Sequence, residues 1–256
     1  MTDASHFRWT SAARSHVGLV RKINEDACLD QPARKLWAVA DGMGGHTLGD
    51  VASRMVVEGL ETLPEPGSLA QFTADARDCL QTVNRHLLTE AAIRNAQLIG
   101  STVVVLLAYD RHCTCLWAGD SRIYLCRSGQ LKQLTRDHSQ VAELISRGTL
   151  SPGDALNHPA RNLITRAVGA ADTLDLDEET LEVNDGDVFL LCSDGLSNAV
   201  SEQELRAVLI PGDCAQAADA LIGMALQQGG RDNISVVVVR AEDPDSTDRT
   251  VLNPAL

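Results

Sequence analysis

The spacing of apolar and polar positions predicts helices in the first half of the chain and again near its end. From residue 48 to residue 63 apolar side chains recur every three or four positions, which is typical of a helix with one buried face. Pro64 is expected to end this helix. A second stripe with the same spacing runs through 69–97, and shorter helices are predicted over 202–209 and 215–228.

Short runs of apolar and β-branched residues predict strands between and after these helices. Residues 36–40 form such a run, which ends at Asp41 and a glycine-rich turn, as expected for a buried strand that presents a polar residue at its end. Four further runs separated by turn residues predict an antiparallel meander over 102–109, 114–118, 123–126 and 131–134. The last strands are predicted at 174–183, 187–192 and 234–239.

The order of these elements favours an α+β fold, in which two packed antiparallel β-sheets carry helices on their outer faces. This arrangement uses every predicted element, although the pattern alone leaves the order of the four layers open. With 256 residues the chain can form one large core, and we expect a single domain over 1–241. The irregular segment 137–170 is typical of a functional flap. The polar segment 242–256 is expected to be a disordered tail.

Charge and composition limit the partners that this chain can bind. A net charge of −13 works against binding to nucleic-acid backbones or anionic membranes, and an aromatic content of 3% leaves few rings for base stacking. No run approaches the roughly 20 apolar residues of a membrane span, and the first nine residues lack the pattern of a signal peptide. We therefore expect a cytoplasmic protein that binds neither nucleic acid nor membrane. The seven scattered cysteines are interpreted as small buried side chains in a reducing compartment.

Asp41, Asp194 and Asp232 stand in glycine-containing segments beside predicted strands. Glycine permits sharp turns and lets a carbonyl oxygen approach a cation closely. Any one of these segments is typical of an ordinary turn, but carboxylates that converge without basic partners repel one another, and hard cations relieve that repulsion. No cluster of histidines and cysteines competes, so the pattern favours magnesium or manganese over zinc.

Seven short motifs follow one another along the chain. They are Arg-x-x-Asn-Glu-Asp at 21–26, Val-Ala-Asp-Gly-Met-Gly-Gly at 39–45, Gly-Ser-Thr at 100–102, Ala-Gly-Asp-Ser-Arg at 118–122, Leu-Thr-Arg-Asp-His-Ser at 134–139, Leu-Cys-Ser-Asp-Gly-Leu at 191–196 and Asp-Asn-Ile-Ser at 232–235. With these motifs the chain resembles the bacterial members of the metal-dependent (PPM, or type 2C) Ser/Thr protein phosphatases across residues 14–240. The resemblance implies a four-layer αββα sandwich and two bound Mn²⁺ or Mg²⁺ ions.

The resemblance also implies a role for each matching position in the metal centre. Asp41 would bridge the two ions, and the Gly42 carbonyl would help to bind the second. Asp194 and Asp232 would complete the first site, and Glu25 would hold the second ion mainly through water. Two ions about 3.5–4 Å apart lower the pKa of a shared water, which yields a hydroxide that attacks phosphorus in line.

Three further positions match family features outside these two metal sites. Arg21 matches the phosphate-binding arginine, whose guanidinium can hold two phosphoryl oxygens. Asp120 matches a position that in bacterial members helps to hold a third ion together with Asp194. Asp26 is expected to orient its neighbours rather than to bind metal.

Proton donation to the leaving group has no assigned residue. Animal members carry a histidine directly after the Asp-Gly pair, whereas this chain has Met43, as bacterial members commonly do. His46 is close in sequence but is expected to point elsewhere, which leaves protonation to a metal-bound water. A cysteine-based mechanism would need a C-x5-R loop, and the residue at that distance from Cys192 is Asn198.

Two other functions stay open at this point. An inactive binding relative should have lost a metal ligand, but every one is present, and a hydrolase of small phosphoesters would carry the same centre. For the phosphatase we expect a monomer that acts on the phosphorylated protein substrates of a bacterial Ser/Thr kinase, in signalling or secretion control. Thr247 and Thr250 lie in an acidic segment of the kind that kinases modify and forkhead-associated domains recognise, although a tail without a role is the alternative.

Overall fold

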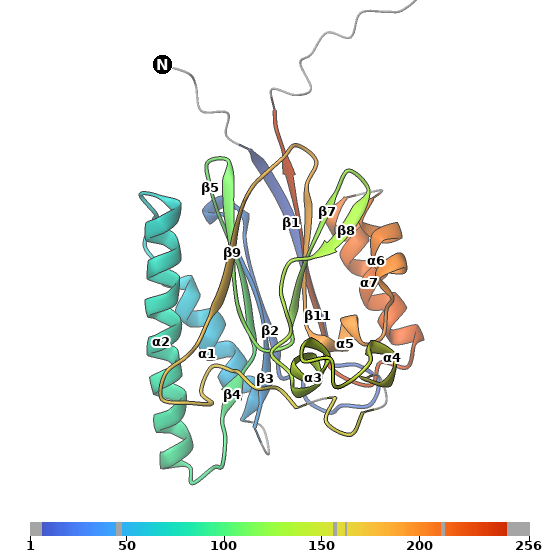
Figure 1. Ribbon diagram of the computed structural model, residues 1–256. Coiled ribbons are helices and arrows are strands. Elements are labelled where there is room, and N and C mark those ends of the chain that lie inside the picture. Colours follow the sequence, from blue (N-terminus) through green and yellow to red (C-terminus); the bar gives the residue numbers. More distant parts are fainter. Residues whose placement is uncertain (1–6, 45–47, 156–157, 162, 211–212, 245–256) are drawn as a thin grey trace, which may run out of the picture.

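Two antiparallel β-sheets pack face to face in the computed structural model, which describes residues 7–44, 48–155, 158–161, 163–210 and 213–244 (Figure 1). One sheet has the order β1 (Arg8–His16), β11 (Ile234–Glu242), β10 (Val188–Cys192), β7 (Arg122–Arg127) and β8 (Gln130–Gln133). The other has the order β2 (Asp26–Gln31), β3 (Leu36–Met43), β5 (Val103–Tyr109), β6 (His112–Ala118) and β9 (Asp177–Glu182), with β4 (Gly100–Ser101) paired to β3.

Helices cover the outer face of each sheet, which confirms the predicted four-layer αββα sandwich (Figure 1). On one side lie α1 (Gly49–Glu61) and α2 (Leu69–Ile93), and on the other lie α6 (Glu202–Leu209) and α7 (Cys214–Gln227). Four short helices complete the fold: the 3-10 helix η1 (Pro32–Arg34), α3 (Gln140–Ser146), α4 (Pro152–Ala155) and α5 (Asp194–Ser197). Within the described ranges no helix is both long and apolar enough to cross a bilayer.

The core consists of three apolar layers that follow from this order. Central strands such as β10 are buried at every residue, because the partner sheet covers one face and helices cover the other. The layer between the sheets holds much of the sparse aromatic content, including Trp37 and Phe189. Trp9 packs on Trp37 with their ring centroids 5.2 Å apart. Aliphatic side chains fill the two layers between helices and sheets.

The helices begin and end close to the predicted positions. α2 begins after Ser68, whose hydroxyl accepts a hydrogen bond from the Gln71 N–H. It ends at Ile93 rather than at residue 97, since Asn95 adopts a left-handed backbone with φ of 51°. α6 begins with a capping box between Ser201 and Glu204.

The prediction of one continuous meander was wrong. β5 and β6 pair within the six-stranded sheet, whereas β7 and β8 pair within the other sheet, where β7 also pairs with β10. The chain therefore crosses between the sheets at residues 119–121 instead of forming a hairpin there. β1 and β2 were not predicted at all, because both strands mix polar with apolar residues and bury only some positions.

The described part of the predicted flap and the first residues of the predicted tail lie at opposite ends of the sandwich (Figure 1). Residues 137–170 contain α3 and α4 but, in their described part, only isolated bridges instead of strands. At the other end β11 extends to Glu242, and the Asp243 N–H donates to Asp185 Oδ1 at 2.8 Å. The expectation of a disordered tail, and with it Thr247 and Thr250, falls on residues 245–256, outside the described residues.

Candidate metal centre

Carboxylates from both sheets meet at one end of the sandwich. Asp41 lies near the end of β3, and Asp120 follows β6 in the same sheet. From the other sheet come Asp194, which follows β10 as the first residue of α5, and Asp232, just before β11. Asp41 interacts electrostatically with the other three and with Asp26, so the structure brings the predicted aspartates into one group.

The backbone around Asp41 is held in place by Ser101 of β4 and by Thr102, which links β4 to β5. The Asp41 N–H donates to Thr102 Oγ1 at 3.1 Å, and the Asp41 carbonyl accepts from the Thr102 N–H at 2.8 Å and from Ser101 Oγ at 3.0 Å. Gly42 donates its N–H to the Glu25 carbonyl at 3.0 Å. A Cβ atom at Gly42 would lie 1.9 Å from the Gly49 carbonyl oxygen, so a larger residue cannot occupy this position.

Burial and mutual repulsion raise the pKa values of four of these aspartates. Burial, followed by the charges of neighbouring carboxylates, raises the pKa of Asp26 to about 7 and that of Asp120 to about 7. The same causes raise the pKa of Asp194 to about 6 and that of Asp41 well above its usual range. Burial also raises the pKa of Glu25. Positive charge at this end of the sandwich would relieve the repulsion.

The donor atoms suit hard divalent ions such as Mg²⁺ and Mn²⁺. Carboxylate and carbonyl oxygens dominate, and Asp26 Oδ1 is buried without a hydrogen-bond partner in the described structure. In the described part of the chain, however, no three His, Cys, Asp or Glu side chains lie close enough to form a ligand set as they stand. Asp232 Oδ2 accepts from Arg21 at 2.8 Å, and Glu25 Oε1 accepts from the Gly49 N–H at 3.2 Å. Binding of metal would therefore require these side chains to turn.

Arg21 lies at the edge of the carboxylate group. Its side chain is 53% exposed and forms an ion pair with Asp232. This hydrogen bond and the charges of Asp232, Glu25 and Asp194 raise the pKa of Arg21. The guanidinium is therefore always charged and lies beside the carboxylates, where it can exchange Asp232 for an anionic ligand.

Asn233 organises the segment that carries Arg21 and Glu25, although it received no role from the sequence. Its carboxamide Oδ1 accepts from the Glu25 N–H at 2.8 Å, and its Nδ2 donates to the carbonyls of Val17 and Ile23, both at 2.9 Å. Its position directly after Asp232 in the last motif was the available signal.

Ser193 plays a similar part next to Asp194. Its hydroxyl donates to Asp26 Oδ2 at 2.8 Å and accepts from the Ser235 N–H at 3.0 Å. The Ser193 hydroxyl thus links Asp26 to β11 through one hydrogen bond that it donates and one that it accepts. Asp26 accordingly lies among the other carboxylates with one oxygen held by Ser193.

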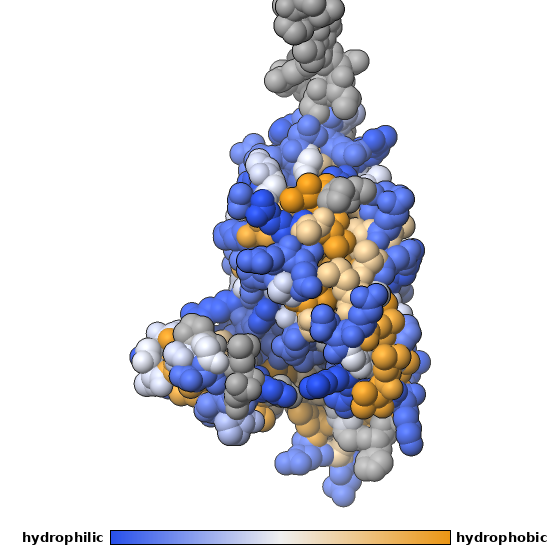
Figure 2. Space-filling view, turned by 90° about the vertical axis from the view of Figure 1, so that its right-hand side faces the viewer, coloured by the Kyte–Doolittle hydropathy of each residue, from blue (hydrophilic) through white to orange (hydrophobic). Residues whose placement is uncertain are grey.

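Both ends of the predicted flap are hydrogen-bonded to backbone close to the carboxylate group. At its start the His138 N–H donates to the Gly119 carbonyl at 2.8 Å, and the Gly119 N–H donates to His138 Nδ1 at 3.2 Å, one residue before Asp120. At its end Val168 and Ser101 form a two-way backbone bridge at 2.9 Å. Figure 2 shows a lobe that stands out from the body at this end, with a recess between lobe and body.

Two other features lie apart from this chemistry. Burial raises the pKa of the Cys192 thiol to about 12, which disfavours the thiolate that a cysteine-based phosphatase requires.

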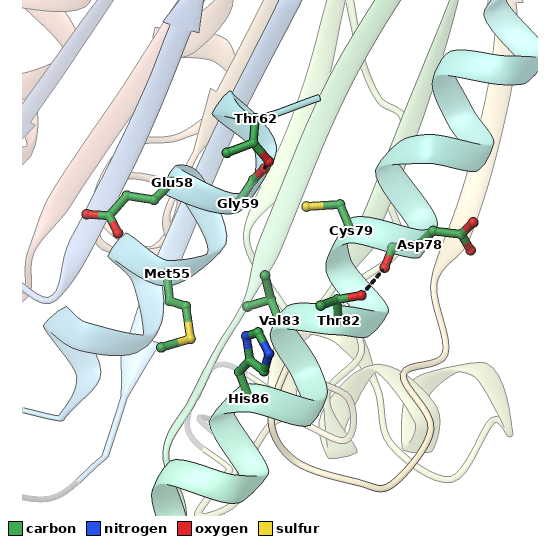
Figure 3. A pocket seen from close by; sticks show the side chains of 9 residues that line it. All are labelled: Met55, Glu58, Gly59, Thr62, Asp78, Cys79, Thr82, Val83 and His86. Carbon is green, nitrogen blue, oxygen red and sulfur yellow. Dashed lines mark hydrogen bonds between the residues drawn. The ribbon is translucent and has the colours of Figure 1, made fainter. Parts of the chain in front are cut away.

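A cavity of about 530 Å³ lies between α1 and α2 (Figure 3). None of the predicted site residues lines it; the lining residues are Met55, Glu58, Gly59, Thr62, Asp78, Cys79, Thr82, Val83 and His86. Met43, which stands where animal members carry a histidine, ends β3, and His46 lies outside the described residues.

The four-layer αββα sandwich with carboxylates from both sheets gathered at one end is the arrangement that the resemblance to metal-dependent phosphatases implies. The sequence matches the family described as Protein phosphatase 2C over residues 14–227. It is 40% identical over 242 residues to the serine/threonine protein phosphatase PstP of Mycobacterium tuberculosis, an alignment that covers 91% of this chain and 45% of the relative. The chain belongs to the protein phosphatase 2C family and spans about half the length of that relative.

Solved structures share both the fold and much of the sequence. PppA, described as a key regulatory component of T6SS in Pseudomonas aeruginosa, matches with a TM-score of 0.86 and 45% identity, over 91% of this chain and 97% of that chain. The catalytic domain of the serine/threonine protein phosphatase PstP in complex with two manganese ions matches with a TM-score of 0.84 and 34% identity. That match covers 93% of this chain and 100% of the other.

Proposed function

We propose that this chain hydrolyses phosphoserine and phosphothreonine in proteins at a binuclear metal centre. The observation that carries the proposal is the group of aspartates from both sheets with Arg21 at its edge, in which burial and mutual repulsion raise the pKa values of Asp41 and Asp194. The 2C family membership and the two manganese ions in a structure of similar fold support it.

In this proposal each carboxylate has a defined place around two ions. Asp41, which interacts electrostatically with aspartates of both sheets, would bridge the ions, while Asp194 and Asp232 would complete one site. The Gly42 carbonyl and Glu25 would serve the other site, and Asp120 with Asp194 would hold a third ion. Bound Mn²⁺ or Mg²⁺ would supply positive charge and lower the pKa of water at the site.

Arg21 would bind the phosphoryl group of the substrate. Its ion pair with Asp232 is exposed, so the guanidinium can leave this partner at a small cost in free energy. Turning away from Asp232 would also free that carboxylate for metal. Phosphate binding by Arg21 and metal binding by Asp232 would therefore favour each other.

We also propose a regulatory role for this chain, in which it opposes a bacterial Ser/Thr kinase. PppA is described as a regulatory component of T6SS, and we propose that this chain acts likewise in signalling or secretion control. Phosphorylated proteins would be its substrates. A forkhead-associated domain that recognises phosphorylated Thr247 or Thr250 is a further proposed partner, which mass spectrometry after treatment with a Ser/Thr kinase would test.

Manganese-dependent release of phosphate from a phosphothreonine peptide tests the catalytic proposal. We expect EDTA to abolish release because it removes the metal ions. Asp194→Asn should also abolish release, because it removes a carboxylate of the first metal site. Asp78→Asn is the matched control, since Asp78 is an exposed aspartate beside the separate cavity of Figure 3. Undiminished activity of Asp194→Asn in EDTA would rule out the mechanism. Small phosphoesters assayed in parallel distinguish a protein phosphatase from a hydrolase of small molecules.

A further inference from the structure

The segment of residues 17–23 between β1 and β2, the rim segment, presents three large apolar side chains to solvent. Leu19 is 65% exposed, Val20 is 66% exposed and Ile23 is 43% exposed. In the described part of the chain only three other large apolar side chains are comparably exposed: Ile93, Leu163 and Ile210. Half of these exposed side chains therefore lie within five positions that also contain Arg21. Such a concentration of apolar surface is typical of a binding site.

Hydrogen bonds to residues 230–233 hold the backbone of the rim segment in place, and its apolar side chains remain exposed. The Leu19 N–H donates to the Gly230 carbonyl at 2.7 Å. The Asn233 carboxamide holds the carbonyls at both ends of the segment, as described above. At Gly18, where φ is +82°, a Cβ atom would lie 2.2 Å from the Asp232 carbonyl oxygen. This close packing presents the apolar side chains in fixed positions.

The position of the rim segment around Arg21 identifies what would cover it. A phosphoryl group held by Arg21 places the rest of its chain over the residues beside Arg21. Successive residues of an extended peptide are about 3.3 Å apart, so residues within two positions of the phosphorylated one would reach Leu19, Val20 and Ile23. A charged residue at the same peptide positions would lose hydration against these apolar side chains.

We propose that the rim segment selects phosphorylated protein segments that carry apolar residues within two positions of the phosphoserine or phosphothreonine. The inference rests on the proposed phosphatase function and on Arg21 as the phosphate-binding group. Val20 and Ile23 are the specificity-determining side chains. Leu19 also packs near Gly230 and therefore has a structural part as well.

Three matched phosphothreonine peptides test this proposal. One peptide carries valine or leucine on both sides of the phosphothreonine, the second carries serine and the third aspartate. We expect the wild-type protein to prefer the apolar peptide over the serine peptide roughly tenfold in kcat/KM, mostly through KM, with the aspartate peptide poorest. In the Val20→Ser/Ile23→Ser variant the preference should fall to about twofold or less.

Ile93→Ser is the control, because Ile93 is an equally exposed apolar residue at the end of α2. It should keep the wild-type preference, and p-nitrophenyl phosphate hydrolysis normalises all variants for the state of the metal centre. A wild-type protein without preference, or a double variant that keeps it, would overturn the inference while leaving the phosphatase function intact. Failure to hydrolyse any phosphopeptide would instead count against the proposed function.

Discussion

Asp26 and Asp41 stand directly opposite each other on the antiparallel strands β2 and β3. Cross-strand partners in this register bring their side chains to one face of the sheet, where like charges destabilise the pair. Burial compounds the repulsion, because Asp26 is only 9% exposed and Asp194 and Asp232 add further negative charge. The fold thus places an unfavourable pair of carboxyl groups at the centre of its proposed chemistry.

The stability of the metal-free protein should fall as pH rises. The folded-state pKa values of Asp26, Asp120 and Asp194 are raised, so the folded protein binds more protons than the unfolded chain. Their stabilising effect is complete below the ordinary carboxyl pKa of about 4 and is lost as pH rises through about 6 to 7. We expect a loss on the order of a few kcal/mol.

Thermal unfolding in EDTA between pH 4 and pH 8 measures this loss. Asp26→Asn should flatten the decline of Tm with pH, because it removes one of the opposed charges, whereas Asp78→Asn should leave the decline unchanged. A Tm in EDTA that rises steadily from pH 5 to pH 8 would contradict the prediction.

Manganese should stabilise the protein through the aspartates. A ligand that binds only the folded state adds about 2.7 kcal/mol at one hundred times its Kd. We expect Tm to rise with Mn²⁺ concentration at pH 7.5, and Asp41→Asn to remove most of that rise because Asp41 would contact both ions. The Asp78→Asn control should retain the rise. An equal rise in Asp41→Asn would show that manganese acts elsewhere on the chain.

Much of the fold was predictable from periodicity because its central elements are buried in regular patterns. β10 and β11 are almost continuously apolar, and α1 and α7 bury one face each. β1 escaped prediction because it lies at a sheet edge, where polar residues are tolerated and the pattern weakens.

The candidate site was predictable only in part, for a different physical reason. Asp41, Asp194 and Asp232 stand in recognisable glycine-containing segments, and the structure brings them together. The predicted meander was wrong at Asp120, because the chain passes there from one sheet to the other. Asn233 could not be predicted as a clamp, because its three hydrogen bonds reach residues more than 200 positions away in the sequence.

Replacement of Asn233 should weaken the fold and displace the rim segment together. Asn233→Ala removes three hydrogen bonds of a buried carboxamide and leaves the Glu25 N–H and two carbonyls without that partner. We expect the free energy of unfolding in urea to fall by roughly 2–4 kcal/mol. Asn184→Ala, at an exposed asparagine, should change it by less than about 0.5 kcal/mol. Equal stability of the two variants would show that the three hydrogen bonds of Asn233 do not stabilise the fold.

Replacement of Arg21 should impair substrate binding far more than stability. The Arg21–Asp232 ion pair has side chains 53% and 38% exposed, so its loss should cost less than about 1 kcal/mol of folding free energy. Loss of a charged, bidentate partner for phosphate should raise KM for a phosphothreonine peptide by roughly ten- to a hundredfold in Arg21→Ala.

Steady-state kinetics with three variants separates these effects. Arg21→Lys keeps the charge but loses the two-pronged geometry, so its KM should lie between those of the wild type and Arg21→Ala. Arg8→Ala removes another exposed ion pair, with Glu242 at the far end of β11, and should leave KM unchanged. If Arg21→Ala lowered Tm strongly and left KM unaltered, Arg21 would be a structural partner of Asp232 rather than a phosphate ligand.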